Sequence, residues 1–197
     1  MINDIIEVKN IFDKDANDFF IRIVSGQRCW SVDSDSNSMS ILKRLGYDTS
    51  ISEECSDTGM LLTSFLDTLP DHVNDYNSNL NDYAYLILEV ALAKASTKIK
   101  FEGIRIKRYL WNYYNRSSCG YFHNDYSASN HCSVVYYLNT CDGYTQIDDK
   151  KIYSEAGKCI FFDSHIGHKG VGPKKDKKRF VLNIAFEYQN IIRLEDN

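Results

Sequence analysis

The sequence predicts a mainly β fold with supporting helices, in which a double-sheet core of the jelly-roll type follows a helical first half. Helical spacing of apolar residues is confined to residues 1–100 of the 197-residue chain. In residues 101–190, short segments of alternating side chains recur, separated by Gly or Asp turns. Several short strands after a helical start are typical of a closed or double-sheet β core that is braced by helices.

Two helices are expected in the first half. Apolar residues at helical spacing run from Ala16 to Val24, with Asp13 as a candidate N-cap and Gly26 as a stop. Residues 80–95 have helical length and are apolar nearly all round, which predicts a main supporting helix buried against a sheet. Residues 31–40 are rich in Ser, Asp and Asn, which favours a solvated, mobile loop over a substrate lid.

Strands are expected at intervals through the second half. In the first, Ile104, Ile106 and Arg108 are predicted on one side and Tyr109 on the other, because side chains alternate along a strand. The last has an apolar face at residues 180, 182, 184 and 186, which is expected in the core. The predicted strands are residues 101–110, 133–138, 145–147, 158–162 and 179–188.

Composition predicts a single domain, residues 1–197, with helical support and loops in 1–100 and the β core in 101–190. With 43% hydrophobic and 25% charged residues, the chain is typical of a soluble protein with one sizeable core. A formal charge of −4 gives no overall field that would attract nucleic acid or an anionic membrane. The apolar run at residues 83–93 is too short to span a bilayer, and the first residues lack the basic segment of a secretory signal.

The cysteines favour a cytoplasmic location. Six of them are scattered along the chain without a CxxC pair or a framework spacing. This pattern predicts free thiols in a reducing compartment and argues against zinc binding by cysteine.

A His-x-Asp pair, His123 and Asp125, is the strongest chemical signal. Residues i and i+2 of an extended strand point to the same face, so both side chains can bind one metal ion. A later segment offers His165 and His168 as a third ligand. Two histidines and one carboxylate on one face leave the opposite metal positions open, as a non-haem Fe(II) oxygenase requires for a cosubstrate and O2.

Arg179 begins a strand whose residues 179, 181, 183 and 185 share the face opposite the apolar one. Inside a barrel, an arginine is costly unless it meets an anion, and a carboxylate suits its fork of donors. Tyr137 shares a strand face with Val135 and can lend its hydroxyl to the same anion. The alternative is that Arg179 ends a basic run and points to water.

The stretch from Arg108 to Tyr188 resembles the iron(II)- and 2-oxoglutarate-dependent dioxygenases, most closely their prolyl 4-hydroxylase-like branch. The resemblance implies a double-stranded β-helix, which is a cupin-like jelly roll. The matching pieces are Arg108-Tyr109, residues 120–125, residues 136–139, residues 157–164, His168 and Arg179.

The resemblance also implies roles for single residues. His123, Asp125 and His168 would bind Fe(II), and family spacing to Arg179 selects His168 over His165. Arg179 would pair with the distal carboxylate of 2-oxoglutarate.

Further pocket positions follow from the same resemblance. Tyr137 and Tyr109 would be pocket tyrosines, although the segment from Tyr109 to His123 is a few residues longer here than in the family. Asn183 would be a polar pocket residue. Ala185 stands where some relatives carry a bulky aromatic, which implies a roomier pocket.

The activity that the resemblance implies is hydroxylation of an unactivated C–H bond, coupled to decarboxylation of 2-oxoglutarate to succinate. Fe(II), 2-oxoglutarate and O2 would be required, with ascorbate as a further candidate cofactor. A prolyl residue of a peptide or protein is the expected substrate, and a free amino acid or another small molecule is the alternative. Nucleic acid is not expected, because Ala185 stands where the repair branch carries a second arginine.

Two other classes of function remain open at this point. The chain can be a cupin-like module that holds a metal without turnover, although none of the expected ligands is missing. A zinc hydrolase with the same ligands would lack an obvious general base and would leave Arg179 without a task.

Overall fold

Two helices, α1 (Lys14–Ser25) and α3 (Ser78–Ala95), occur in the computed structural model, which describes residues 2, 4–26, 31–32, 60–65, 78–116, 118–120, 122–176 and 178–194. The Asp13 side chain caps α1 by accepting a hydrogen bond of 2.9 Å from the Ala16 amide, and Gly26 ends the helix. Both predicted helices and both predicted ends of α1 are confirmed.

The main layer is a seven-stranded antiparallel sheet within the described part of the chain, with the order β1-β9-β6-β11-β5-β3-β2. Its strands are β1 (Ile6–Val8), β2 (Ser31–Val32), β3 (Met60–Phe65), β5 (Arg105–Tyr114), β6 (His131–Tyr137), β9 (Cys159–Asp163) and β11 (Arg179–Glu187).

A smaller sheet has the order β10-β7-β8 and consists of β7 (Tyr144–Ile147), β8 (Lys150–Tyr153) and β10 (His168–Val171). Single bridges join Cys119 to Val171 and His123 to His168, so Cys119 and His123 pair with β10 on the side opposite β7. A separate pair is formed by β4 (Ile99–Glu102) and β12 (Asn190–Arg193).

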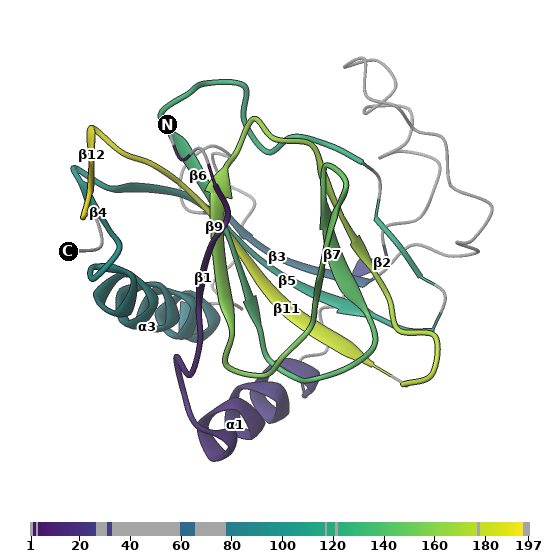
Figure 1. Ribbon diagram of the computed structural model, residues 1–197. Coiled ribbons are helices and arrows are strands. Elements are labelled where there is room, and N and C mark those ends of the chain that lie inside the picture. Colours follow the sequence, from purple (N-terminus) through teal and green to yellow (C-terminus); the bar gives the residue numbers. More distant parts are fainter. Residues whose placement is uncertain are drawn as a thin grey trace.

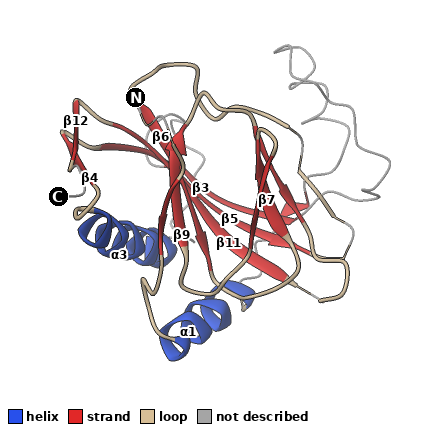
Figure 2. Cartoon of the chain, in the orientation of Figure 1, coloured by secondary structure: helices blue, strands red, loops and turns tan. Residues whose placement is uncertain are grey.

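Side chains of the large sheet fill two hydrophobic cores, one on each face. On one face, Leu182 of β11 packs in a cluster with Val24 of α1 and Leu88 of α3. On the other, Val181 of β11 belongs to a cluster with Ile147 of β7. Figure 1 shows the helices on one side of the large sheet and β7 on the other, and Figure 2 shows the same layers by type of element. This arrangement confirms the predicted jelly-roll architecture, with β11 at the centre of both cores.

A β-bulge in β5 changes which face its residues reach. Ala185 of β11 lies opposite Arg108, but the next residue, Phe186, lies opposite Ile106, which leaves Lys107 without an opposite residue. Ile106 consequently packs toward the helices, whereas Arg108 reaches Asp125 on the other face. The prediction that Ile106 and Arg108 share one side is wrong, because the bulge shifts the alternation by one residue.

The other differences from the predicted strands concern their ends and the shortest strands. Residues 101–110 divide between β4 and β5 at Gly103, whose φ is 64°, and β5 continues to Tyr114. In the segment predicted as a loop, residues 31 and 32 form β2, and residues 33–40 lie outside the described residues. The sequence did not predict β1, β2, β3, β8 or β12.

Neither helix is a membrane span. Within the described ranges, no helix is long and apolar enough to cross a membrane. Cys132, Cys141 and Cys159 are free, as predicted. Cys119 is disulfide-bonded, which corrects the prediction of a free thiol at this position. Cys29 and Cys55 lie outside the described residues.

Candidate metal centre and carboxylate pocket

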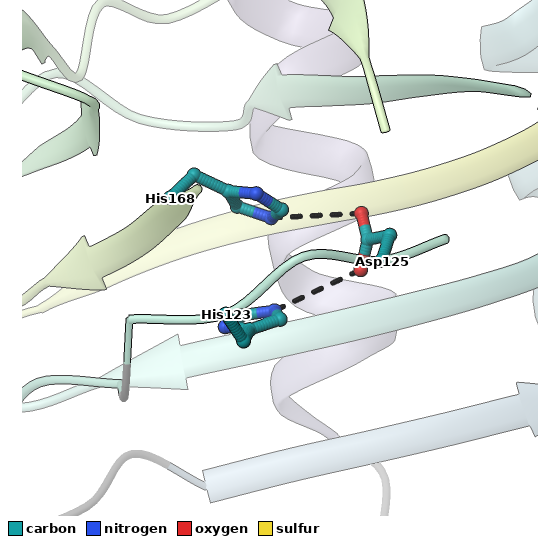
Figure 3. Close-up of side chains that lie close together, drawn as sticks. All are labelled: His123, Asp125 and His168. Atoms are coloured by element: carbon teal, nitrogen blue, oxygen red, sulfur yellow. Dashed lines mark ion pairs between the residues drawn. The ribbon is translucent and has the colours of Figure 1, made fainter. Parts of the chain in front are cut away.

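Three side chains with metal-ligating atoms meet beside β10. His123, Asp125 and His168 each offer one ligand atom, and these atoms all lie within 4.8 Å of one another. The Asp125 carboxylate lies between the two imidazoles, with Oδ1 at 3.7 Å from Nε2 of His123 and Oδ2 at 3.5 Å from Nε2 of His168 (Figure 3). Of the two candidate third ligands, the structure brings His168 to the pair and not His165.

Backbone pairing holds the three residues in place. The His123 amide donates to the His168 carbonyl at 3.0 Å, and the His168 amide donates to the His123 carbonyl at 2.9 Å. Residues paired in this way point their side chains to the same face. The Asp125 amide donates to the Ser164 carbonyl at 3.0 Å, which fixes the second residue of the His-x-Asp pair on the turn before β10.

The Asp125 carboxylate is buried but carries its charge. Burial alone would raise its pKa, but the Arg108 guanidinium, followed by His168 and His123, holds the pKa well below the usual range. Ser133 donates a hydrogen bond of 2.6 Å to Oδ2. Asp125 is therefore an anion at neutral pH, as a metal-binding carboxylate must be.

His168 is buried and neutral. Burial, only partly opposed by the nearby Asp125 charge, lowers its pKa to about 4. Its Nδ1 lies 3.1 Å from the Ile166 carbonyl oxygen, which can only accept a hydrogen bond. This contact places the ring proton on Nδ1 and leaves the Nε2 lone pair facing Asp125.

The residues present fit a divalent metal ion. The buried Nε2 of His168 has no hydrogen-bond partner among the described residues, although it belongs to the cluster of ligand atoms. An unprotonated nitrogen in this position is satisfied by a cation. Two imidazoles and one carboxylate are the donor set of a non-haem iron centre with open positions.

Arg179 lies on the inner face of β11 and is fully buried. Its Nη2 donates to Thr145 Oγ1 at 2.7 Å, and the Tyr137 hydroxyl donates to the same oxygen at 3.0 Å. The guanidinium carbon lies 4.9 Å from the centre of the Tyr114 ring and 5.6 Å from that of Tyr137. The alternative in which Arg179 points to water is thereby excluded.

A carboxylate fits this arginine. Nε and Nη1 of Arg179 are buried and have no hydrogen-bond partner among the described residues. Within the described part of the chain, the guanidinium contacts Thr145, Tyr114 and Tyr137, and none of these side chains is acidic. A buried guanidinium with two unused donors is costly, and an anion with two oxygens removes that cost.

The metal-ligand cluster and the arginine belong to one site. His168 and Gly170 alternate on β10 and pair with Ile147 and Thr145 of β7. The side chains of His168, Ile147 and Thr145 therefore face the same way, as would a side chain at position 170. A Cβ atom at Gly170 would lie 3.1 Å from Nη1 of Arg179. Glycine at this position therefore keeps open the space between the arginine and the strand that carries His168.

Tyr109 does not reach this site, which corrects its prediction as a pocket residue. It is buried in the core on the helix side, where burial raises its pKa and Tyr85 and Glu89 of α3 add to the shift. Tyr114 is the β5 tyrosine that faces Arg179, because the two residues lie opposite each other in the β5–β11 pair. A predicted strand that continued from residue 101 past residue 110 would have placed Tyr114 on the same face as Arg108, and would thus have indicated Tyr114 as the pocket tyrosine.

Asn183 and Ala185 lie on the same face of β11 as Arg179. The Asn183 Oδ1 atom is buried and has no hydrogen-bond partner among the described residues. Ala185 is fully buried and lies opposite both Arg108 and Ser133. Sequence reasoning missed the contacts of Thr145, Ser133 and Arg108, which form only when the strands assemble.

Comparison with known proteins supports the fold through structure and not through sequence. The sequence matches no protein-family model. It also matches no curated protein.

Solved structures match over nearly the whole chain. A viral collagen prolyl hydroxylase from Paramecium bursaria Chlorella virus-1, in complex with 2-oxoglutarate, matches with a TM-score of 0.52 and 13% identity, covering 94% of this chain and 96% of that one. A prolyl hydroxylase from Trichoplax adhaerens, in complex with a hypoxia-inducible-factor peptide, matches with a TM-score of 0.54 and 12% identity, covering 94% and 84%.

A third match is an enzyme of nogalamycin biosynthesis. SnoN, a non-haem α-ketoglutarate-dependent epimerase of nogalamycin biosynthesis, matches with a TM-score of 0.59 and 10% identity, covering 96% of this chain and 80% of that one. These matches confirm the predicted double-sheet β architecture. The chain has the fold of the iron- and 2-oxoglutarate-dependent dioxygenases.

Proposed function

We propose that the chain is an Fe(II)- and 2-oxoglutarate-dependent dioxygenase that hydroxylates an unactivated C–H bond. One observation carries the proposal: a cluster of two histidines and a carboxylate shares one site with a buried arginine that has two unused donors. The fold of the matched dioxygenases supports it. A metal module without turnover would have no use for the Arg179 pocket.

The metal, when bound, supplies the activation of O2 that C–H oxidation requires. The side chains prepare the site for it. His168 keeps its Nε2 lone pair at neutral pH because its pKa is about 4, and Asp125 stays ionised. Arg179 and Thr145 would orient the distal carboxylate of 2-oxoglutarate. Apolar side chains such as Ile147 and Phe162 exclude water from the space between the sheets.

For the substrate, we propose a prolyl residue of a peptide or protein. The motif resemblance to prolyl 4-hydroxylases supports this choice, as do two matched prolyl hydroxylases, one of which is bound to a peptide. A small-molecule substrate is the second candidate, because SnoN matches with a TM-score of 0.59.

Anaerobic binding of Fe(II) and 2-oxoglutarate tests the site. The wild-type protein should develop the metal-to-ligand charge-transfer absorbance of a chelated 2-oxo acid. His168→Ala and Arg179→Ala should lose this band at moderate 2-oxoglutarate concentration, whereas His165→Ala should keep it, because His165 is not part of the cluster. Absence of the band in the wild-type protein would reject the dioxygenase proposal.

Turnover then separates the two substrate classes. Succinate formation should rise when proline-containing peptides are added, and the peptide should gain one oxygen atom in mass spectrometry. A rise with free amino acids or other small molecules, and none with peptides, would favour the second candidate.

A further inference from the structure

Arg108 and Ser133 hold the Asp125 carboxylate from two sides. Arg108 of β5 forms an ion pair with Oδ1, and the Ser133 hydroxyl of β6 donates to Oδ2 at 2.6 Å. The Ser133 hydroxyl also lies 2.8 Å from that of Ser164, at the end of β9. The Asp125 side chain is only 2% exposed, so its two oxygens depend on these partners rather than on water.

The central strand β11 sets the spacing between the two partners. Ala185 lies opposite Arg108 on one side and opposite Ser133 on the other, so the three residues form one row across the sheet. Regular pairing of residues 108–114 with β11 places Arg108 on the same face as Tyr114, and the bulge at Lys107 changes the face only of the residues before it. Because the middle residue of the row is an alanine, both flanking side chains can reach the same carboxylate. The smallness of residue 185 therefore accommodates the Arg108–Asp125 contact.

An arginine here has an electrostatic cost for a metal site. A guanidinium that touches a metal-binding carboxylate also lies close to the divalent ion and repels it. The benefit that can outweigh this repulsion is orientation: a guanidinium is a planar, rigid donor that fixes the rotation of a carboxylate. Residues that hold metal ligands in this way change metal affinity by roughly 10- to 100-fold.

We propose that Arg108 is a positioning residue of the metal centre, which together with Ser133 sets the rotation of the Asp125 carboxylate for metal binding. The proposal rests on the proposed function, because it takes Asp125 to be a metal ligand. It differs from a purely structural ion pair in one respect: removing Arg108 should change the metal affinity of protein that remains folded.

Titration with Mn(II) in the absence of 2-oxoglutarate tests this role, with isothermal titration calorimetry as the readout. Arg108→Met removes both the charge and the donors. Arg108→Lys keeps a positive charge beside Asp125 but loses the planar fork, which separates charge from orientation. Lys107→Met is the matched control, since it removes a cation from the neighbouring position, where Lys107 pairs with Glu187 at 3.1 Å.

The wild-type protein and Lys107→Met should bind Mn(II) with dissociation constants within about twofold of each other. Arg108→Met should bind about 10- to 100-fold more weakly, and Arg108→Lys at least severalfold more weakly. The visible spectrum of the Co(II) forms should also change in both Arg108 variants, because the carboxylate would meet the metal at a different angle. Should Arg108→Met fail to fold by circular dichroism, Arg108→Lys decides alone, because it keeps the countercharge for Asp125.

Different results would reject the positioning role of Arg108 and the proposed function. Unchanged affinity and an unchanged Co(II) spectrum in Arg108→Lys would reject the positioning role, even if thermal stability fell. Tighter Mn(II) binding in Arg108→Met would show that repulsion outweighs orientation and would also reject it. Failure of the wild-type protein to bind Mn(II) or Co(II) would overturn the proposed function together with this inference.

Discussion

Tyr114 and Arg179 lie opposite each other in the β5–β11 pair, and the guanidinium carbon is 4.9 Å from the centre of the tyrosine ring. The ring shields one face of a guanidinium that contacts no acidic side chain within the described ranges. Cation–π contacts of buried arginines contribute about 1–2 kcal/mol. Tyr114 is thus part of the carboxylate pocket, a role that the sequence assigned to Tyr109.

Exchanging each tyrosine for leucine should separate the two positions. Tyr114→Leu should weaken 2-oxoglutarate binding by about 10-fold, because Arg179 loses its ring contact. Tyr109→Leu should lower the free energy of unfolding by about 1–3 kcal/mol and leave 2-oxoglutarate affinity nearly unchanged, because Tyr109 packs on the helix side. Calorimetry and urea unfolding measure the two effects. Equal effects of both variants on 2-oxoglutarate affinity would contradict the assignment.

A methyl group at position 170 should disturb the arginine pocket. A Cβ there would lie 2.3 Å from the Tyr114 hydroxyl and 3.1 Å from Arg179 Nη1, so the buried tyrosine would have to move. Gly170→Ala should cost about 1–3 kcal/mol of stability and weaken 2-oxoglutarate binding by at least about 10-fold. Gly120→Ala is the control, because the atom nearest to its added Cβ would be the Gly170 amide nitrogen, at an ordinary contact distance of 3.7 Å. Similar behaviour of the two variants would argue against a tight pocket.

Thr145 connects Arg179 with Tyr137, because its hydroxyl oxygen accepts a hydrogen bond from each. Thr145→Val keeps the shape but leaves two buried donors without their acceptor, which should cost about 1–3 kcal/mol per donor in the ligand-free protein. Tyr137→Phe removes only one donor and should cost less. Urea unfolding without 2-oxoglutarate measures the difference, and a valine variant as stable as the wild type would refute the shared role.

The stability of the protein should fall in acid partly through His131. Burial lowers its pKa, with Lys107 acting in the same direction and Glu187 against it. Because the unfolded chain then binds a proton more readily than the folded one, the contribution of His131 is complete above its ordinary pKa of about 6.5 and is lost as the pH falls below that value. His131→Phe keeps an aromatic ring on Tyr126, whose ring centre lies 4.6 Å away. The variant should show a smaller loss of unfolding free energy between pH 7 and pH 5 than the wild type.

The sequence predicted those features that depend on local order. The His-x-Asp pair needs only an extended backbone to place His123 and Asp125 together, and alternation along residues 179–186 places Arg179 opposite the apolar face. These two patterns were sufficient to find two of the three metal-ligand residues and the face of β11 that carries Arg179.

Features that depend on pairing between strands could not be predicted in the same way. The bulge at Lys107 exists only relative to β11, so no periodicity within β5 reveals it. Short edge strands such as β1 (Ile6–Val8) offer too few residues for an alternation to be recognised. The contact between Arg108 and Asp125 joins β5 to the segment after His123, and it forms only when the strands assemble.

The bulge also bears on how this chain should be aligned with others. If Lys107 were absent, Arg108 would remain opposite Ala185 and Ile106 opposite Phe186, now in an uninterrupted ladder. A homologous chain that is one residue shorter at this point would present the same two faces and build the same centre. An alignment that places the gap elsewhere in β5 would exchange inner and outer residues and assign the arginine to the wrong side of the sheet.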